Sequence, residues 1–137
     1  MNARKLIFYE LFYNSQTTRK MKHETRYIAP LGLEIGFTIG QNAVENIEAI
    51  NDAKATDMWF HIEDHSSCHV IASMPADIKF DKKQTMYIVK QGAILCKQHS
   101  RYKSQQNVAV VYTTIQNVSP THIMGTVTIQ NGKTVTI

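Results

Sequence analysis

The sequence predicts a single α+β domain with a mainly antiparallel sheet, two helices and a C-terminal β-hairpin. Its 137 residues are enough for one domain with its own hydrophobic core. Stretches with strand-like alternation occur along the whole chain, whereas only two stretches have a helical period. Hydrophobic residues make up 43% of the chain and charged residues 19%, a mixture typical of globular rather than disordered proteins.

The N-terminal part of the chain predicts three strands. Residues 5–13 are rich in aromatic and branched side chains, and a polar, basic loop follows them. Residues 24–29 and 33–39 predict the next two strands. Pro30 and Gly32 place a turn between these two.

A first helix is predicted over residues 43–53. Asn42 precedes it and is a favoured N-cap, because its side-chain oxygen can accept a backbone N–H. Apolar residues at helical spacing are expected to face the core: Val44, Ile47 and Ile50. Glu45 and Glu48 are expected to point outward, near a helix start that favours negative charge.

Two strands, 58–62 and 68–74, are predicted next, with a polar turn between them. Side chains alternate along a strand, so three apolar residues of the first strand lie on one side of it, and this side is expected to face the core: Met58, Phe60 and Ile62. The opposite side of the same strand carries a chemically different set: Asp57, Trp59, His61 and Glu63. The first strand therefore has one apolar side and one side on which chemistry can occur.

The longest predicted helix covers residues 84–102. One stripe of it is mainly apolar: Ile88, Gly92, Leu95, Cys96 and His99. Its opposite side carries cations at helical spacing: Lys83, Lys90, Lys97 and Arg101. This helix is expected to cover the sheet with the stripe and to expose the cations.

The sequence next predicts a strand over residues 108–114 and a loop over residues 116–122. The dipeptide Asn131-Gly132 then separates 126–130 from 133–137. Asn-Gly supplies the positive φ angles that a two-residue turn requires, so these two segments predict a hairpin.

The distribution of charge points to a polyanionic partner. The net charge is +4, and basic residues predominate over residues 4–26 and 79–103, whereas acids predominate over 34–64. Charge sorted in this way can present a basic face to phosphates. The alternative is an ordinary solvated exterior.

The apolar runs, the N-terminus and the cysteines indicate where in the cell the protein is located. No apolar run approaches the roughly 18 residues that span a membrane, and the N-terminus has no recognisable signal peptide. Cys68 and Cys96 are too few for a disulfide framework, so free thiols in a reducing compartment are expected. We therefore expect a cytoplasmic protein that does not engage membranes.

Residues 61–69, H-I-E-D-H-S-S-C-H, contain several potential metal ligands. A small metal-dependent hydrolase is the alternative function, with a site made of His61, Asp64, His65 and His69. The spacing does not match H-E-x-x-H, and neighbours on a strand, such as Cys68 and His69, point to opposite sides. We therefore expect no catalytic residues, no metal and no other cofactor.

Nucleic-acid binding is the preferred interpretation. Cations would contact phosphates, aromatic rings would stack on bases, and amides or imidazoles would form hydrogen bonds. The candidate binding residues are Gln41, Asn42, Trp59, His61, His69, Lys83, Lys90, Lys97, Arg101, Lys103 and Tyr112. Core packing is the alternative role for Trp59 and Tyr112.

Three motifs resemble the NFACT-R domain. They are G-Q-N-A-V-E-N (Gly40 to Asn46), D-M-W-F-H (Asp57 to His61) and S-C-H-V-I (Ser67 to Ile71). The family pattern is G-R-N-x-x-x-N, then D-[ILM]-W-[FL]-H, then S-H-V. The resemblance continues in V-V-Y-T (Val110 to Thr113) and in the G-x-V that begins at Gly125. It covers residues 24–137, and residues 1–23, the N-terminal strand and basic loop, are assigned to the same domain.

The resemblance implies a stand-alone RNA-binding module and no enzyme. Family members act in ribosome-associated quality control, where they bind tRNA and the large ribosomal subunit, and a eukaryotic version is linked to DNA binding. The implied partners are thus tRNA or rRNA, the large subunit and, as a further option, DNA. One departure is that Gln41 replaces the family arginine, which removes a bidentate contact to phosphate or base.

Overall fold

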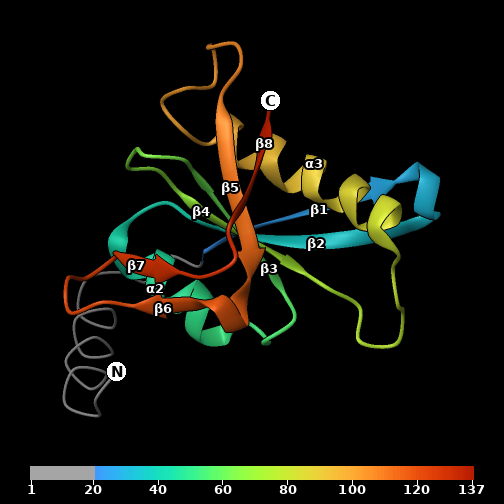
Figure 1. Cartoon of the computed structure of the whole chain (residues 1–137), viewed down its shortest axis with the longest axis horizontal. Coiled ribbons are helices and arrows are strands. Elements are labelled where there is room, and N and C mark those ends of the chain that lie inside the picture. Colours follow the sequence, from blue (N-terminus) through green and yellow to red (C-terminus); the bar gives the residue numbers. More distant parts are fainter. Residues whose placement is uncertain (1–20) are drawn as a thin grey trace.

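A computed structural model describes residues 21–137 and confirms the predicted α+β class (Figure 1). The predicted strand over residues 5–13 lies outside the described residues. The elements in chain order are β1 (Lys22–Ile28), η1 (Ala29–Leu31), β2 (Leu33–Gly40), α2 (Ala43–Asp52), β3 (Met58–Ile62), β4 (His69–Ser73), α3 (Lys82–Gln98), β5 (Ala109–Thr114), η2 (Ile115–Asn117), β6 (Val118–Pro120), β7 (Val127–Ile129) and β8 (Lys133–Thr136). Here η marks a short 3₁₀ helix.

Six strands form one antiparallel sheet in the order β1-β2-β4-β3-β5-β8. Strand β3 is central, and its Phe60 lies opposite Val70 of β4 and Tyr112 of β5. Strands β6 and β7 pair with each other in a separate two-stranded sheet. The predicted loop over residues 116–122 is therefore wrong in part, because η2 and β6 occupy most of it.

Both predicted C-terminal strands are present, but they pair with other partners. Strand β7 pairs with β6, and β8 pairs with β5 at the edge of the large sheet. Asn131 between them has a φ of 55°, whereas Gly132 does not have the positive φ that a type I′ turn also needs. A Cβ on Gly132 would lie 2.9 Å from Cδ1 of Ile129, so a larger residue here would require the end of the Ile129 side chain to shift.

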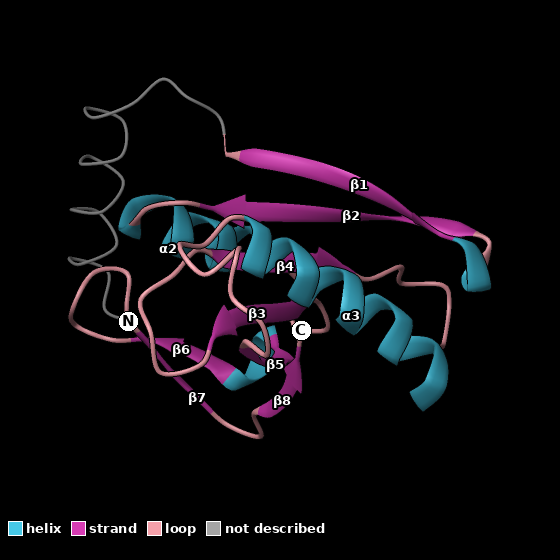
Figure 2. Cartoon of the chain, turned by 90° about the horizontal axis from the view of Figure 1, so that it is seen from above, coloured by secondary structure: helices cyan, strands magenta, loops and turns pink. Residues whose placement is uncertain are grey.

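Helix α3 covers one face of the large sheet (Figure 2). The predicted core side of β3 faces it, and this side is buried: Met58, Phe60 and Ile62. Gly92 of α3 lies directly on Phe60, since a Cβ at Gly92 would come within 2.4 Å of that ring. Helix and sheet are thus in close contact at the centre of the domain.

Helix α2 and the β6–β7 pair cover the opposite face. Their apolar side chains form a second core with one central residue of β3 and one of β4: Val44, Ile47, Ile50, Trp59, Ile71, Ile115 and Val118. The predicted inward positions of α2 are therefore confirmed. Each side of the sheet has its own apolar layer.

The start of α2 confirms one prediction and corrects another. Asn42 is the N-cap, and its Oδ1 accepts the backbone N–H of Glu45 at 2.9 Å. The prediction that Glu45 points outward is wrong, because this residue is 5% exposed. Its carboxylate folds back over the helix start and accepts the N–H of Gln41 at 3.1 Å. Glu48 is half-buried.

Helix α3 begins and ends earlier than predicted. Asp81 and Gln84 form a reciprocal capping box that starts the helix at Lys82. At the other end, the hydroxyl of Ser100 donates to the carbonyl of Lys97, which closes the last turn. Within residues 21–137, no helix has both the length and the apolar character needed to cross a membrane.

Candidate nucleic-acid interface

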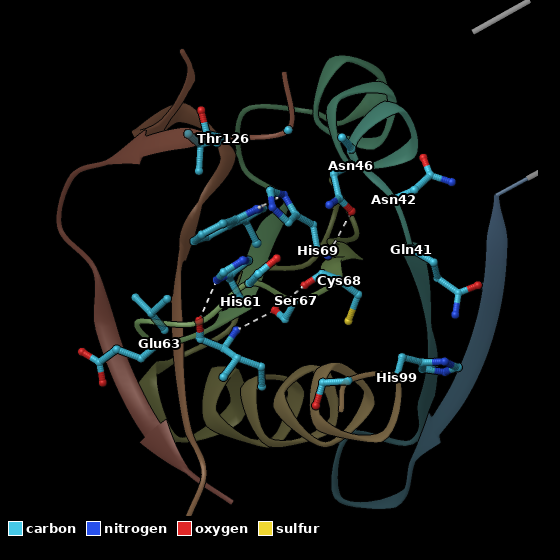
Figure 3. A pocket seen from close by; sticks show the side chains of 18 of the residues that line it. Gln41, Asn42, Asn46, His61, Glu63, Ser67, Cys68, His69, His99 and Thr126 are labelled. Carbon is cyan, nitrogen blue, oxygen red and sulfur yellow. Dashed lines mark hydrogen bonds between the residues drawn. The ribbon is translucent and has the colours of Figure 1, made fainter. Parts of the chain in front are cut away.

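A cleft of about 750 Å³ opens at the end of the central strands (Figure 3). The start of α2, the β3–β4 turn, the end of α3 and the β6–β7 loop line its walls. Six of the predicted binding residues line this cleft: Gln41, Asn42, Trp59, His61, His69 and Arg101. The fold therefore brings together residues that lie up to sixty positions apart in the sequence.

Strand pairing places the two predicted histidines side by side. His61 lies on β3 and His69 on the adjacent antiparallel strand β4. Their ring centroids are 5.0 Å apart, and the rings meet edge to face. His61 and His69, both predicted binding residues, thus lie on adjacent strands beside Trp59.

Trp59 lies beneath the histidines. Its ring is parallel to His61 with a centroid distance of 5.6 Å, and perpendicular to His69 at 5.4 Å. The residue is 2% exposed, so its ring is not accessible to a base in this structure. His61, which is half-buried, is the ring that faces the cleft (Figure 3).

Hydrogen bonds determine which nitrogen of each histidine carries the proton. The indole N–H of Trp59 donates to Nδ1 of His69 at 3.1 Å, so the neutral His69 ring carries its proton on Nε2. Nδ1 of His61 lies 2.6 Å from the carbonyl oxygen of Ile62. A carbonyl can only accept, so Nδ1 carries the proton of His61 and Nε2 is left as an acceptor.

Burial keeps both rings neutral. It lowers the pKa of His69 to about 3, and the neighbouring His61 contributes to the same shift. Burial also lowers the pKa of His61, against the opposing effect of the hydrogen bond to Ile62. At neutral pH the floor of the cleft therefore offers uncharged hydrogen-bonding groups.

Asn46 connects α2 to β4 and was not among the predicted binding residues. Its Oδ1 accepts the backbone N–H of His69 at 3.1 Å, and the residue is 6% exposed. A Cβ on Gly40 would lie 2.5 Å from this oxygen, so glycine is required at that position. The available signal was an asparagine inside a predicted helix, where this residue type is disfavoured unless its side chain has a specific partner.

The β3–β4 turn is held by Ser67. Its hydroxyl accepts the N–H of Ile62 at 3.1 Å and donates to the carbonyl of Cys68 at 2.9 Å. Behind the turn, the Sγ atoms of Cys68 and Cys96 are 4.0 Å apart, and both thiols are free and buried, as predicted. Their mutual hydrogen bond raises the pKa of Cys96 and lowers the pKa of Cys68.

Asp57, the first residue of the D-M-W-F-H motif, lies at the other end of β3. Its two carboxylate oxygens accept the backbone N–H groups of Lys54 and Met74, each at 2.9 Å. The residue is 4% exposed and is not part of the cleft lining. Asp57 thus stabilises the start of the strand that carries Trp59 and His61.

The predicted cations are distributed more widely than the predicted rings. Arg101 lines the cleft, and Lys103 is exposed in the loop that follows α3. Lys83 and Lys90 are exposed along α3, outside the cleft. Lys97 is half-buried and donates to the carbonyl oxygen of the C-terminal residue at 3.2 Å.

Tyr112 lies away from the other predicted residues. It lines a second cleft, of about 410 Å³, together with residues at the start of α3. Its hydroxyl donates to Sδ of Met86 at 3.6 Å, and its ring packs on Phe60 with a centroid distance of 6.2 Å. The core-packing alternative therefore describes its contacts in this structure.

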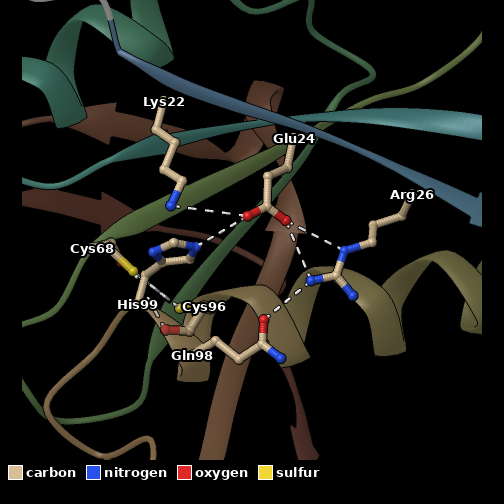
Figure 4. A network of polar contacts seen from close by, with 7 residues as sticks. All are labelled: Lys22, Glu24, Arg26, Cys68, Cys96, Gln98 and His99. Carbon is tan, nitrogen blue, oxygen red and sulfur yellow. Dashed lines mark hydrogen bonds and ion pairs between the residues drawn. The ribbon is translucent and has the colours of Figure 1, made fainter.

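A polar network joins β1 to the end of α3 beside the main cleft (Figure 4). Glu24 contacts three cationic or titratable side chains: Lys22 at 4.0 Å, Arg26 at 3.3 Å and His99 at 3.6 Å. Arg26 also donates to Gln98 at 3.1 Å. These contacts are partly exposed, so each adds little stability, but together they position the segment that leads to Arg101.

The hydrolase alternative requires His61, Asp64, His65 and His69 around one ion. In the described part of the chain, no three His, Cys, Asp or Glu side chains are arranged to hold a metal. Nδ1 of both His61 and His69 is engaged within the protein. His65 instead packs against Tyr102 at a ring distance of 4.8 Å.

Comparison with known proteins agrees with this arrangement. Residues 35–134 match the model of the NFACT protein RNA binding domain family. No curated protein matches the chain. The solved C-terminal part of the fibronectin/fibrinogen-binding protein from Streptococcus suis is similar, with a TM-score of 0.68 and 22% identity.

That similarity covers 98% of this chain and 56% of the solved chain, so our chain spans little more than half of that structure. At this identity the similarity shows the fold alone. The family match is the stronger finding, because it extends over most of the chain and contains every motif that lines the cleft. The chain therefore belongs to the NFACT RNA-binding domain family, a family of nucleic-acid-binding modules.

Proposed function

We propose that this protein binds RNA through the main cleft and the cations beside it. The observation that carries this proposal is the convergence of six predicted binding residues, from Gln41 to Arg101, on one cleft. The family match over residues 35–134 supports RNA as the ligand. In this proposal the protein has no catalytic role.

The basic residues closest to the cleft would contact the phosphate backbone. Arg101 lies at the cleft itself, and Lys103 follows two residues later in an exposed loop. Lys90 and Lys83 extend the basic surface along α3 for a longer RNA. Such contacts release counterions from the RNA, so the affinity should decrease as the salt concentration rises.

We further propose tRNA or rRNA as the physiological ligand, in a cytoplasmic, translation-related context on the large ribosomal subunit. The resemblance of the three cleft-lining motifs to those of ribosome-associated family members supports this assignment. The two buried free thiols agree with a reducing compartment. DNA is the competing polyanion, and a direct comparison of both nucleic acids decides between them.

The test is fluorescence polarisation with labelled tRNA and with single-stranded DNA of equal length. We expect tRNA to bind more tightly, and its affinity to fall by roughly tenfold between 50 and 200 mM salt. Substituting Lys90, Arg101 and Lys103 by Gln should flatten this salt dependence. A control variant carries Lys54→Gln and Lys133→Gln, two cations outside the main cleft, and so removes two charges where the triple variant removes three.

Two outcomes would contradict the proposed phosphate contacts. One is an affinity for tRNA that does not change with salt concentration, and the other is an unchanged salt dependence in the triple variant. Ribosome pelleting with and without nuclease tests the cellular context. Pelleting that survives complete removal of RNA would favour a protein partner over RNA.

A further inference from the structure

The floor of the cleft contains buried hydrogen-bond donors that the described part of the protein does not satisfy. Asn46 uses its Oδ1 to accept the N–H of His69. Its Nδ2 group has no acceptor among residues 21–137, although the residue is 6% exposed and lines the cleft. Buried amide groups are normally paired, so this donor is available to a group that enters the cleft.

His69 presents a second donor of this kind. Because Nδ1 accepts from Trp59, the proton of the neutral ring is on Nε2. Nε2 has no acceptor in the described chain, and His69 is 2% exposed. Asn46 and His69 come from different elements, α2 and β4, and both line the same cleft (Figure 3).

His61 adds an acceptor and a flat surface. Its Nδ1 proton is bound to the carbonyl of Ile62, so Nε2 remains available to accept a hydrogen bond. The ring lies parallel to Trp59, which supports it from below. The cleft thus combines two donors, one acceptor and an aromatic face within a small volume.

The charge of the lining disfavours a phosphate as the group that enters. The lining contains the carboxylates of Glu63 and Asp64 and the guanidinium of Arg101. Of its three histidines, His61 and His69 are neutral, and His99 is paired with Glu24. A backbone phosphodiester carries one negative charge, and here it would meet two carboxylates and one guanidinium. A neutral, flat molecule with acceptors and a donor on its edge satisfies every group described above.

We propose that the cleft holds one unpaired nucleobase of the bound RNA. The base enters with its edge toward Asn46 and His69, which donate to its acceptors, while His61 accepts from its exocyclic or ring N–H. The phosphates stay outside, next to Arg101 and Lys103. This inference rests on the proposed RNA binding and deepens it: the edge that pairs in a duplex is used by the protein, so the RNA must be unpaired at this nucleotide.

The protein contains its own reporter, because Trp59 is its single tryptophan and lies beneath His61. The experiment titrates Trp59 fluorescence with three RNAs of the same sequence: a single strand, the same strand with one abasic nucleotide, and the duplex. We expect the single strand to quench Trp59 and to bind about tenfold more tightly than the other two. Free adenosine, guanosine, cytidine and uridine at millimolar concentration identify the preferred base.

Two conservative substitutions test the assigned groups. His61→Phe keeps a ring on Trp59 and removes Nε2, and Asn46→Asp keeps the acceptor for the His69 N–H but removes the Nδ2 donor. Each should weaken binding of the single strand about tenfold while leaving the salt slope unchanged. Asn51→Asp, at an exposed position of the same helix, is the matched control and should bind like the unmodified protein.

Circular dichroism establishes that each variant is folded, and if Asn46→Asp unfolds, His61→Phe and the abasic strand decide the question. Equal affinity for the intact and abasic strands, or undiminished binding by His61→Phe, would overturn the base pocket. In that outcome salt-dependent tRNA binding would persist, so RNA binding itself would stand. If the unmodified protein bound no RNA at all, the proposed function itself would be refuted.

Discussion

The two faces of strand β3 are made by alternating residues of one short segment, yet they are covered in opposite ways. On one face Phe60 is fully buried, and α3 approaches it so closely that only Gly92 fits. On the other face Trp59 and His61 form a polar, aromatic stack at the floor of an open cleft. Alternation therefore places a fully buried core residue and the residues of the proposed binding cleft one position apart in the same strand.

The face of β3 that carries Phe60 is called the closed face below, and the face that carries Trp59 and His61 is called the open face. The open face is ordered although it lines a cleft. It has no close-packed helix above His61, so hydrogen bonds fix its side chains instead. Trp59 orients His69, the carbonyl of Ile62 orients His61, and Asn46 holds the backbone of β4. The closed face depends on packing, which is insensitive to pH, whereas the open face depends on groups that can be protonated.

The largest expected effect tests the closed face. Phe60→Ala should lower the free energy of unfolding by about 4 kcal/mol, because it removes a fully buried ring and leaves a cavity under Gly92. Urea denaturation measures this loss. Ile78→Ala, at a side chain that is 41% exposed, is the control and should change stability by less than about 0.5 kcal/mol. If His61→Ala were as destabilising as Phe60→Ala, the division between the faces would be wrong.

The next effect tests the open face by pH. The pKa of His69 is about 3 in the folded protein and about 6.5 in the unfolded chain, so between these values the unfolded chain binds the proton. The stability that depends on neutral His69 is complete above pH 6.5 and decreases as the pH falls toward 3. Lowering the pH from 7 to 5 should cost about 2 kcal/mol from this residue.

Denaturation at both pH values, followed by the fluorescence of Trp59, measures this dependence. His69→Gln should reduce the difference between pH 7 and pH 5, since the titrating group is gone. An identical pH dependence in this variant would show that other groups cause the acid sensitivity.

A smaller effect tests the bond between the two rings. Trp59→Phe removes the indole N–H and leaves Nδ1 of His69 without its donor, which should cost between about 1 and 2 kcal/mol. A double-mutant cycle with His69→Gln separates the hydrogen bond from the lost indole volume. A coupling energy near zero would mean that the bond does not stabilise the open face.

The smallest expected effect on stability concerns α3, the helix that covers the closed face. Asp81→Ala removes the capping box of α3 and should lower stability by about 1 kcal/mol without changing affinity for RNA. Thermal unfolding and polarisation with labelled RNA are measured on the same preparation. Asp77→Ala, at an exposed acid in the preceding loop, controls for the loss of charge. Weaker RNA binding by Asp81→Ala alone would mean that the two faces are coupled through α3.

The sequence predicted the elements and the alternation of β3 well, because both follow from local periodicity. Asn42 as N-cap also followed from a local rule, whereas the contact between His61 and His69 depends on the pairing of β3 with β4. Alternation could not predict which parts of the fold cover each side of β3. Trp59 shares a side with His61, and only the structure shows that it lies under that ring at 2% exposure.

Other differences arise from interactions between distant segments. The cations of α3 share a helical side in the sequence, but the end of the helix before Arg101 sends this residue to the cleft while Lys90 stays outside. The C-terminal strands flank a favourable Asn-Gly turn, yet β8 pairs with the edge of β5 and β7 pairs with β6. Asn46 gains its role only when α2 packs against β4.

The pair of strands β6 and β7 forms no ladder with the large sheet, although the loop between them supplies one wall of the cleft. In this loop Gly125, with a φ of 84°, lies so close to Ala43 that a Cβ would come within 2.7 Å of the alanine methyl group. The wall is thus seated on α2 by two of the smallest residues, while Val118 of β6 and Met124 of the loop pack into the second core. A substitution at the exposed Thr126 can therefore reshape this wall without repacking the second core, whereas a change in the length of the loop would also displace Met124 within that core.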